Sequence, residues 1–403
     1  MDKKTLRDLD VAGQKVLVRV DFNVPFDAEG NISDDTRIRA SLDTIKYLLD
    51  NDAAVICMAH LGRPKGEVNP KYTLAPVAKH LGKLLGKKIS FAPDCVGDVA
   101  KAAAKNLKAG QLLLLENLRF HKEEEKNDMD FAEQLASLAD LYVNDGFGVS
   151  HRAHASVEGV THFLPAAAGF LLEKEIAFVG KAVTEPLHPF AAIIGGAKVS
   201  DKISVIENLL TKADKVMICG AMAYTFFKAL GYEVGKSKCE LDYVEYAKGL
   251  LEKANGKLIL PVDLTCANPT DEACAEDFFG AISACDTKIV KPTEIPADWQ
   301  CLDCGPETIK FYAQQLEGAK TVVWNGPAGV FEVERYAVGT KAICETLANL
   351  EGATTIIGGG DSAAAAISMG YEAKFSHIST GGGASLEYLE GKTLPGVACL
   401  DDK

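Results

Sequence analysis

The 403-residue sequence lacks any apolar run that approaches the roughly 20 residues needed for a membrane-spanning helix. The longest candidate, residues 163–172, is too short and is followed by Glu173. The first residues are charged and lack the apolar centre of a secretion signal. We therefore expect a cytoplasmic protein without a membrane segment.

The sequence also lacks a net positive charge, because 43 basic residues are outnumbered by 56 acidic ones. The formal net charge is −13 and the pI is about 5.2, which excludes a general affinity for nucleic acid or membrane surfaces. Only eight residues are arginine, and all but Arg335 lie before residue 153: Arg7, Arg19, Arg37, Arg39, Arg63, Arg119 and Arg152. The planar guanidinium suits phosphate and carboxylate, so the first half is a candidate for holding an anion. The composition alone is equally compatible with a chance distribution of the arginines along the chain.

Two common nucleotide fingerprints are missing. No G-x-G-x-x-G follows a predicted strand, which argues against a dinucleotide site. Gly-Lys-Thr at residues 391–393 resembles the end of a P-loop, but Leu386 stands where that motif needs its first glycine. We interpret this tripeptide as a surface turn.

The eleven cysteines lack the spacing of a zinc site. Only Cys301 and Cys304 form a C-x-x-C pair, and neither a second pair nor a histidine lies at finger-like spacing. We expect small buried thiols in a reducing cytosol. A redox-sensitive Cys301–Cys304 pair is the alternative.

The sequence does contain short apolar runs that alternate with amphipathic stretches, a pattern typical of α/β proteins with parallel sheets. The length favours two domains. Strands are predicted at residues 15–20, 53–59, 112–115, 141–143, 190–194, 215–219, 257–260, 321–324 and 354–357. Among the predicted helices is one over 200–212 with Ser200 as its N-cap. A helix near 166–183, followed by Pro186 and Pro189, is the predicted linker.

Polar and basic residues follow each predicted strand of the first half. They are Asp21 and Asn23, then His60 and Arg63, then Glu116, Asn117 and Arg119, then Asn144, Asp145, His151 and Arg152. Ligands of open α/β sheets bind beyond the carboxyl ends of the strands. Each residue alone could simply cap a helix or face water, but four such strand ends together indicate an anion site.

Glycines follow the strands of the second half instead. They lie at residues 195–196, 326 and 329, 358–360 and 381–383, and Lys198 and Lys202 accompany the turn after the first of these strands. Glycine lets the backbone approach a ligand closely, and helix N-termini present free N–H groups to phosphate. These turns therefore favour a nucleotide site. Asp361 is either a simple helix N-cap or a ligand of Mg²⁺ that also contacts phosphates.

Eight ordered motifs support a more specific interpretation. They are R-V-D-F-N-V-P at 19–25, H-L-G-R-P at 60–64, L-R-F-H at 118–121 with E-E-E at 123–125, H-R-A-H-A-S at 151–156, G-G-A-K-V-S-D-K at 195–202, W-N-G-P at 324–327, G-V-F-E at 329–332 and S-T-G-G-G at 379–383. In this order they resemble the phosphoglycerate kinase family along almost the whole chain. Gly146, Val149, Ser150 and Ser362 depart from the family pattern without removing a charged group.

The resemblance implies two Rossmann-like lobes, each with a parallel β-sheet flanked by helices and joined by a hinge helix. Residues 1–170 would form the phosphoglycerate-binding lobe, to which a tail at 387–403 returns. Residues 171–187 would form the interdomain helix and linker, and residues 188–386 the nucleotide-binding lobe. The implied activity is reversible phosphoryl transfer between 1,3-bisphosphoglycerate and ADP, giving 3-phosphoglycerate and ATP, with Mg²⁺ as cofactor. We expect a glycolytic monomer.

The resemblance also implies roles for individual residues. The acid substrate would be bound by Asp21, Asn23, Arg37, His60, Arg63, Arg119 and Arg152. The nucleotide would be bound by Lys202, Glu332, Gly359, Gly360, Asp361 and Ser362, with Asp361 also serving Mg²⁺. The phosphoryl group in transfer would be faced by Arg37, Lys198, Gly382 and Gly383.

The reacting oxygens of both substrates are already ionised at neutral pH, so no general base is expected. Catalysis would rest on positioning, on neutralising the phosphoryl oxygens and on hinge closure that excludes water. Arg37 could alternatively form only a solvated basic pair with Arg39. Three other functions remain open: an NAD-dependent dehydrogenase, a non-catalytic scaffold homologue and another acyl-phosphate kinase.

Overall fold

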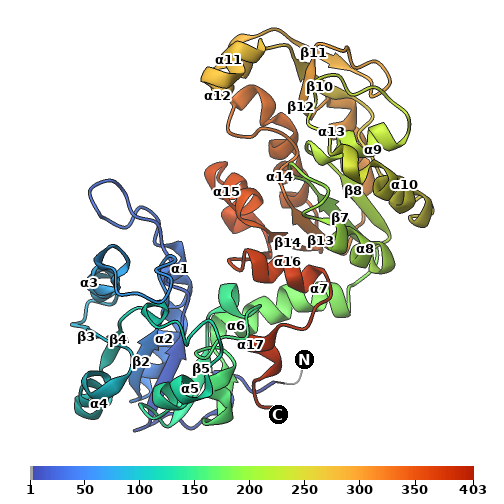
Figure 1. Cartoon of the computed structure of the whole chain (residues 1–403). Coiled ribbons are helices and arrows are strands. Elements are labelled where there is room, and N and C mark those ends of the chain that lie inside the picture. Colours follow the sequence, from blue (N-terminus) through green and yellow to red (C-terminus); the bar gives the residue numbers. More distant parts are fainter. Residues whose placement is uncertain (1–2) are drawn as a thin grey trace. The chain divides into compact units, whose positions relative to one another are not determined.

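The computed structural model describes residues 3–403, and the chain divides into two compact units (Figure 1). Unit 1 runs to Ala177 and also contains Thr393–Lys403, and unit 2 comprises Phe178–Lys392. Each unit has its own six-stranded parallel sheet flanked by helices, which confirms the predicted α/β fold class.

The sheet of unit 1 has the strand order β3-β4-β2-β1-β5-β6. Its strands are β1 (Lys15–Arg19), β2 (Ala54–Met58), β3 (Ser90–Ala92), β4 (Leu112–Leu115), β5 (Leu141–Asn144) and β6 (Ala166–Ala168). The chain first winds outward from β1 through β2 and then returns to place β5 on the other side of β1. Such a reversal is a topological switch point, where open α/β sheets bind their ligands.

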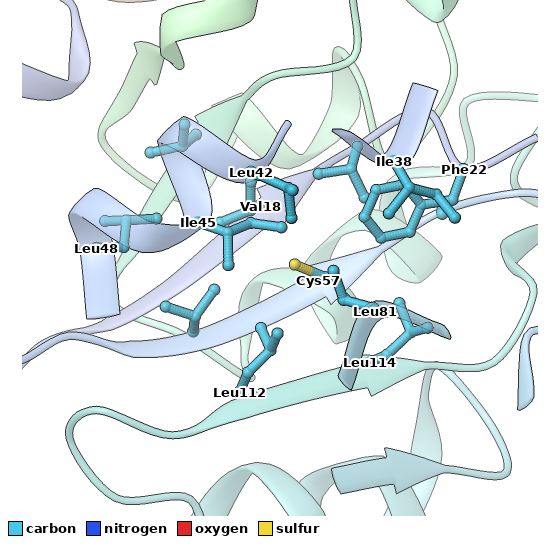
Figure 2. Close-up of a cluster of buried hydrophobic side chains, with 14 of the residues drawn as sticks. Val18, Phe22, Ile38, Leu42, Ile45, Leu48, Cys57, Leu81, Leu112 and Leu114 are labelled. Atoms are coloured by element: carbon cyan, nitrogen blue, oxygen red, sulfur yellow. The ribbon is translucent and has the colours of Figure 1, made fainter. Parts of the chain in front are cut away.

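Helices cover this sheet on both faces. They are α1 (Thr36–Ala40), α2 (Leu42–Asp50), α3 (Ala75–Leu85), α4 (Gly97–Asn106), α5 (Met129–Ala136), α6 (Phe170–Glu175) and α17 (Pro395–Ala398). Figure 2 shows Leu42, Ile45 and Leu48, one stripe of α2, lying over the strand residues Val18 and Cys57. Residues at i, i+3 and i+6 share one helix face, so the sequence places α2 on the sheet. Each fully buried leucine or isoleucine contributes about 1.5–3 kcal/mol.

The sheet of unit 2 has the strand order β15-β14-β13-β7-β8-β9. Its strands are β7 (Phe190–Ile194), β8 (Lys215–Ile218), β9 (Leu258–Ile259), β13 (Thr321–Asn325), β14 (Thr354–Gly358) and β15 (His377–Ile378). The order again reverses, here between β7 and β13. The glycine turns after these two strands therefore lie at the switch point of unit 2.

Ten helices accompany the sheets of unit 2. They are α7 (Lys181–Thr184), α8 (Ile203–Lys212), α9 (Met222–Ala229), α10 (Val244–Lys253), α11 (Asp271–Glu276), α12 (Phe278–Ala284), α13 (Pro306–Leu316), α14 (Val338–Ala348), α15 (Gly360–Ser368) and α16 (Gly383–Leu389). The hydroxyl of Ser200, predicted to cap a helix, instead donates to Glu240 Oε1 over 2.6 Å. The helix begins only at Ile203, after Lys202, so the predicted cap was wrong.

The start of the predicted linker helix was also wrong. Ala166–Ala168 form β6 beside β5, because small side chains allow this strand to pack closely at the sheet. The helical run starts at Phe170, continues through a π-helical turn at Ile176–Gly180 and ends at Thr184.

Unit 2 also contains an antiparallel sheet that the sequence analysis missed, formed by β11 (Thr287–Val290), β10 (Leu264–Ala267) and β12 (Gln300–Cys304). This sheet pairs Cys266 with Cys301 in a disulfide, so the expectation that all cysteines are free thiols was wrong. Cys304 is a buried free thiol opposite Leu264, two residues along β10, and does not pair with Cys301. Cross-strand register therefore decides the pairing, and C-x-x-C spacing does not.

Within residues 3–403, no helix is both long and apolar enough to cross a bilayer.

Candidate functional site

Arg37, Asp21 and Asn23 form the first part of a polar cluster in unit 1. One guanidinium nitrogen of Arg37, on α1, lies 3.0 Å from Asp21 Oδ2 and donates to the Asn23 carbonyl over 3.2 Å. Asn23 Oδ1 in turn accepts from the Gly62 N–H over 2.9 Å. Arg37 thus binds the loop after β1, and Asn23 connects that loop to Gly62 in the loop after β2. Arg39 points elsewhere and pairs with Asp35, so the solvated Arg37–Arg39 pair is not formed.

His60 lies just beyond β2 and is 5% exposed. Burial, followed by the positive charges of Arg19, Arg119 and Arg37, lowers the pKa of His60 well below its usual range. His60 is therefore neutral near pH 7. Its Nδ1 lies 3.3 Å from Arg19, which can only donate, so Nδ1 accepts and the ring proton resides on Nε2. This proton is oriented by a fixed partner and can be offered to an anion.

Arg119 comes from η3 (Leu118–Phe120), a short 3-10 helix that follows β4. Its guanidinium donates to the Gly62 carbonyl over 3.1 Å and forms an ion pair with Glu125 at 3.3 Å. Asn117 shapes this turn, because its side chain bonds to both the N–H and the C=O of Leu61 and to the N–H of Arg119. The sequence predicted Asn117 at a strand end but indicated no role for it in the site.

Arg19, Glu124 and Ser156 form a buried layer beneath the cluster that the sequence analysis missed. Arg19 Nε donates to Ser156 Oγ over 2.8 Å, and Ser156 Oγ donates to Glu124 Oε1 over 2.6 Å. All three residues are fully buried. The available signal was an arginine inside an otherwise apolar strand, since a buried cation needs such partners.

Arg63 and Arg152, both predicted to bind the acid substrate, are exposed. Burial lowers the pKa of Arg119 and of His154, and the positive charges of Arg63 and Arg152, respectively, lower them further. Ser150, one of the residues that depart from the family pattern, is fully buried. Its hydroxyl accepts from Asn144 over 3.1 Å and donates to the Gly146 carbonyl over 2.9 Å.

In unit 2 the glycine turns after β7 and β13 are packed against each other. A Cβ atom at Gly195 would lie 2.3 Å from the Pro327 carbonyl oxygen, and one at Gly326 would lie 2.2 Å from the Gly195 carbonyl oxygen. Gly326 also has a φ of +97°. Side chains are therefore excluded at both positions, and backbone alone forms this part of the sheet edge.

Lys202 and Ser362 are linked through the end of β13. Lys202 Nζ donates to Asn325 Oδ1, and burial lowers the pKa of Lys202. Ser362 Oγ accepts from the Gly326 N–H over 3.2 Å and donates to the Gly358 carbonyl over 2.7 Å. Ser362 thus ties the turn after β14 to the turn after β13.

A cavity of about 530 Å³ opens beside these turns. Its apolar wall includes Phe278, Phe279, Leu302, Val330 and Phe331. Its polar wall includes Gly196, Lys236, Lys238, Glu332 and Asp361. The combination suits a ligand with a flat apolar part and a charged part.

The remaining predicted residues lie on turns and helix starts of unit 2. Gly359, not Asp361, is the N-cap of α15, so the simple N-cap interpretation of Asp361 was wrong and its exposed carboxylate lines the cavity. Gly360 is the first residue of α15. Gly382 has a φ of +50° and precedes Gly383, the first residue of α16. Lys198 is exposed in the turn after β7.

Two doubly wound α/β units, one with a basic cluster and one with glycine turns beside a cavity, fit the class of two-lobed enzymes that act on phosphorylated ligands. The family profile described as phosphoglycerate kinase matches residues 6–392. The chain is 58% identical to phosphoglycerate kinase of Moorella thermoacetica and 53% identical to that of Pelotomaculum thermopropionicum, with 100% of each chain covered. The solved phosphoglycerate kinase of Coxiella burnetii is 37% identical, with a TM-score of 0.89 over 98% of both chains.

The chain belongs to the phosphoglycerate kinase family. Its activity is the phosphotransferase reaction of that family, which uses a carboxyl group as acceptor and a magnesium nucleotide as the second substrate. The family assignment decides against the dehydrogenase and against another acyl-phosphate kinase.

Proposed function

We propose that unit 1 binds 3-phosphoglycerate or 1,3-bisphosphoglycerate through Asp21, Asn23, Arg37, His60, Arg63, Arg119 and Arg152. The observation that carries this proposal is the basic cluster around His60, in a chain whose net charge is −13. The positive charges of Arg19, Arg119 and Arg37 all oppose protonation of His60, and a bound phosphate would relieve their mutual repulsion. Neutral His60 supplies one N–H donor from Nε2.

Unit 2 then binds ADP or ATP through Lys202, Glu332, Gly359, Gly360, Asp361 and Ser362. The apolar wall of the cavity fits a nucleobase, and the glycine turns and the start of α15 fit the phosphates. Mg²⁺ prefers oxygen ligands and needs only one or two carboxylates, and the exposed Asp361 on the cavity wall fits that requirement. The ion, when bound, would neutralise phosphate charge.

Transfer itself requires groups that stabilise the three equatorial oxygens of the phosphoryl group. Arg37, Lys198 and the backbone N–H groups near Gly382 and Gly383 supply this positive field in our proposal. No proton needs to be removed from either reacting oxygen, since both are ionised at neutral pH. Because one set of binding residues lies in unit 1 and the other in unit 2, transfer requires both bound ligands to meet. We propose that this happens by hinge closure, with residues 171–187 as the hinge. We further propose that the protein acts as a monomer.

A coupled assay with 3-phosphoglycerate, Mg-ATP, glyceraldehyde-phosphate dehydrogenase and NADH tests these roles. Arg37→Ala and Lys198→Ala should each lower kcat by roughly 100-fold or more, because each removes charge that acts on the transition state. Nucleotide affinity of Arg37→Ala should stay unchanged. Arg39→Ala is the matched control on the same helix and should keep normal turnover.

Unchanged kcat in folded Arg37→Ala would refute its role in transfer. Absence of NADH consumption by well-folded wild-type protein would instead favour the scaffold homologue.

A further inference from the structure

Asp94, Cys95 and His121 bring three different metal-ligating groups together in unit 1. Asp94 and Cys95 lie in the loop that follows β3, and His121 directly follows η3, which comes after β4. Strands β3 and β4 are parallel neighbours, so both loops leave the same edge of the sheet. A carboxylate oxygen, the thiol sulfur and an imidazole nitrogen from these residues all lie within 4.8 Å of one another.

The His121–Asp94 pair alone has an ordinary structural explanation. His121 Nε2 lies 2.7 Å from Asp94 Oδ1, and the imidazole packs on Phe131 with ring centroids 5.2 Å apart. Similar pairs occur on the surface without a nearby thiol, for example His80 with Asp35 at 2.8 Å. Such a pair ties two loops together and needs no ion.

Cys95 distinguishes this cluster from the other pairs. It is a free thiol with 0% exposure, yet it lies beside two polar groups of which one is a carboxylate. Burial, followed by the charges of Asp94, Glu124 and Glu116, raises the pKa of Cys95 well above its usual range. The carboxylates that oppose a thiolate here would favour a bound cation, which stabilises the thiolate directly.

The donor set selects the kind of ion. Thiolate and imidazole are the ligands of zinc-class ions, whereas Mg²⁺ takes oxygen ligands and keeps several waters. We propose that Asp94, Cys95 and His121 bind one zinc-class divalent cation, with water in the fourth position. Binding displaces the thiol proton of Cys95 to solvent. The site is separate from the magnesium that accompanies the nucleotide in unit 2.

Binding of an ion requires the hydrogen bond between His121 and Asp94 to open. Two tetrahedral ligands about 2 Å from zinc lie about 3.3 Å apart. The present separation of 2.7 Å between Nε2 and Oδ1 is a direct hydrogen bond. Binding of the ion would therefore increase the distance between these two atoms by about half an ångström. Asp94 Oδ1 also accepts from the Cys95 N–H over 2.6 Å, which holds the carboxylate beside Cys95. The Asp94 side chain is 45% exposed, so an ion can reach the cluster from solvent.

Cobalt titration of the full-length protein with the Cys266–Cys301 disulfide intact tests the proposal. We expect one Co²⁺ per chain, a near-ultraviolet thiolate-to-cobalt absorption band, the visible bands of tetrahedral cobalt, and displacement of cobalt by Zn²⁺. Cys95→Ala should abolish the thiolate band. His121→Ala should weaken binding roughly tenfold or more while keeping a thiolate band.

Two control variants are matched to the cluster. His80→Ala removes a His–carboxylate pair that has no thiol nearby, and Cys274→Ala removes a free thiol on α11. Neither should change the cobalt spectrum. Far-ultraviolet circular dichroism and thermal unfolding without metal check that the variants fold, and His121→Ala remains informative should Cys95→Ala not fold.

Absence of a thiolate band in folded wild-type protein would overturn the proposal. An undiminished band in folded Cys95→Ala, or equal cobalt affinity in His121→Ala, would also overturn it. The readout does not depend on kinase activity, so its failure leaves the proposed function intact.

Discussion

Asp145 shows how one buried carboxyl group makes stability depend on pH. It follows β5 and is fully buried, with Oδ1 accepting from Thr44 Oγ1 over 2.8 Å and from the Leu171 N–H over 3.0 Å. Burial raises the pKa of Asp145 to about 7. In the unfolded chain the value is about 3.9. Between these two values the folded state binds more protons than the unfolded state, so this group lowers stability as pH rises.

Asp145→Asn should remove that dependence. The free energy of unfolding of the variant, relative to wild type, should therefore increase by about 2–3 kcal/mol between pH 5 and pH 8. Urea unfolding at both pH values measures this difference. Asp27→Asn is the control, because hydrogen bonds from Asn31 lower the pKa of this exposed carboxylate and it is ionised in both states over this range. A constant difference for Asp145→Asn would contradict the prediction.

At the residue scale, the sequence predicted which residues lie at the same edge of the sheet. It could not predict how deeply each side chain is buried. The strand-end rule predicted Asp21, His60 and Arg119 at one edge of the sheet. In the structure Asp21 pairs with Arg37, His60 contacts Arg19, and Arg119 donates to the Gly62 carbonyl. It could not predict that Arg19 is fully buried while Arg63 is exposed, since both are arginines near a strand end. Burial depends on which loop folds over the side chain, and that is a tertiary property.

At the scale of elements, the Cys266–Cys301 disulfide joins β10 to β12 across a bulged register. The closed loop spans 35 residues of sequence separation. Cross-linking a loop of this length restricts the unfolded chain and should contribute about 4 kcal/mol. Oxidised wild-type protein should therefore unfold at a higher guanidinium concentration than the same protein after reduction.

The double variant Cys266→Ser with Cys301→Ser is the matched control, because its unfolding midpoint should not respond to reductant. Thiol titration of the denatured, unreduced wild-type protein should find nine reactive thiols, as expected for eleven cysteines with one disulfide. Eleven reactive thiols and a midpoint insensitive to reductant would contradict the prediction.

The strands of the three sheets show which elements the sequence could predict. Fully buried parallel strands such as β2 and β13 are continuous apolar runs and were predicted nearly to their bounds. Strand β11 has three exposed residues out of four, and β15 has only two residues, so neither produces an apolar run. Strand β6 is three alanines, a composition that also suits a helix, and only its pairing with β5 makes it a strand.

At the scale of the whole molecule, the reaction determines what the two units must do. The proposed acid-substrate residues all belong to unit 1 and the proposed nucleotide residues to unit 2. In-line transfer requires the reacting oxygen and phosphorus atoms to approach to about 3–3.5 Å. Water must also be excluded, because it would compete with the acceptor carboxylate or ADP. Each ligand alone occupies the binding residues of only one unit. Closure should therefore require both ligands to be bound.

Small-angle X-ray scattering should therefore show a smaller radius of gyration with 3-phosphoglycerate and Mg-nucleotide together than with either ligand alone. Lys202→Met is the control, because loss of the Lys202–Asn325 contact and of a phosphate partner should prevent the decrease at the same ligand concentrations. A decrease with nucleotide alone would mean that one unit's ligand drives closure by itself. An unchanged radius with both ligands saturating, in protein that still turns over, would rule out closure of the two units as the step that brings the substrates together.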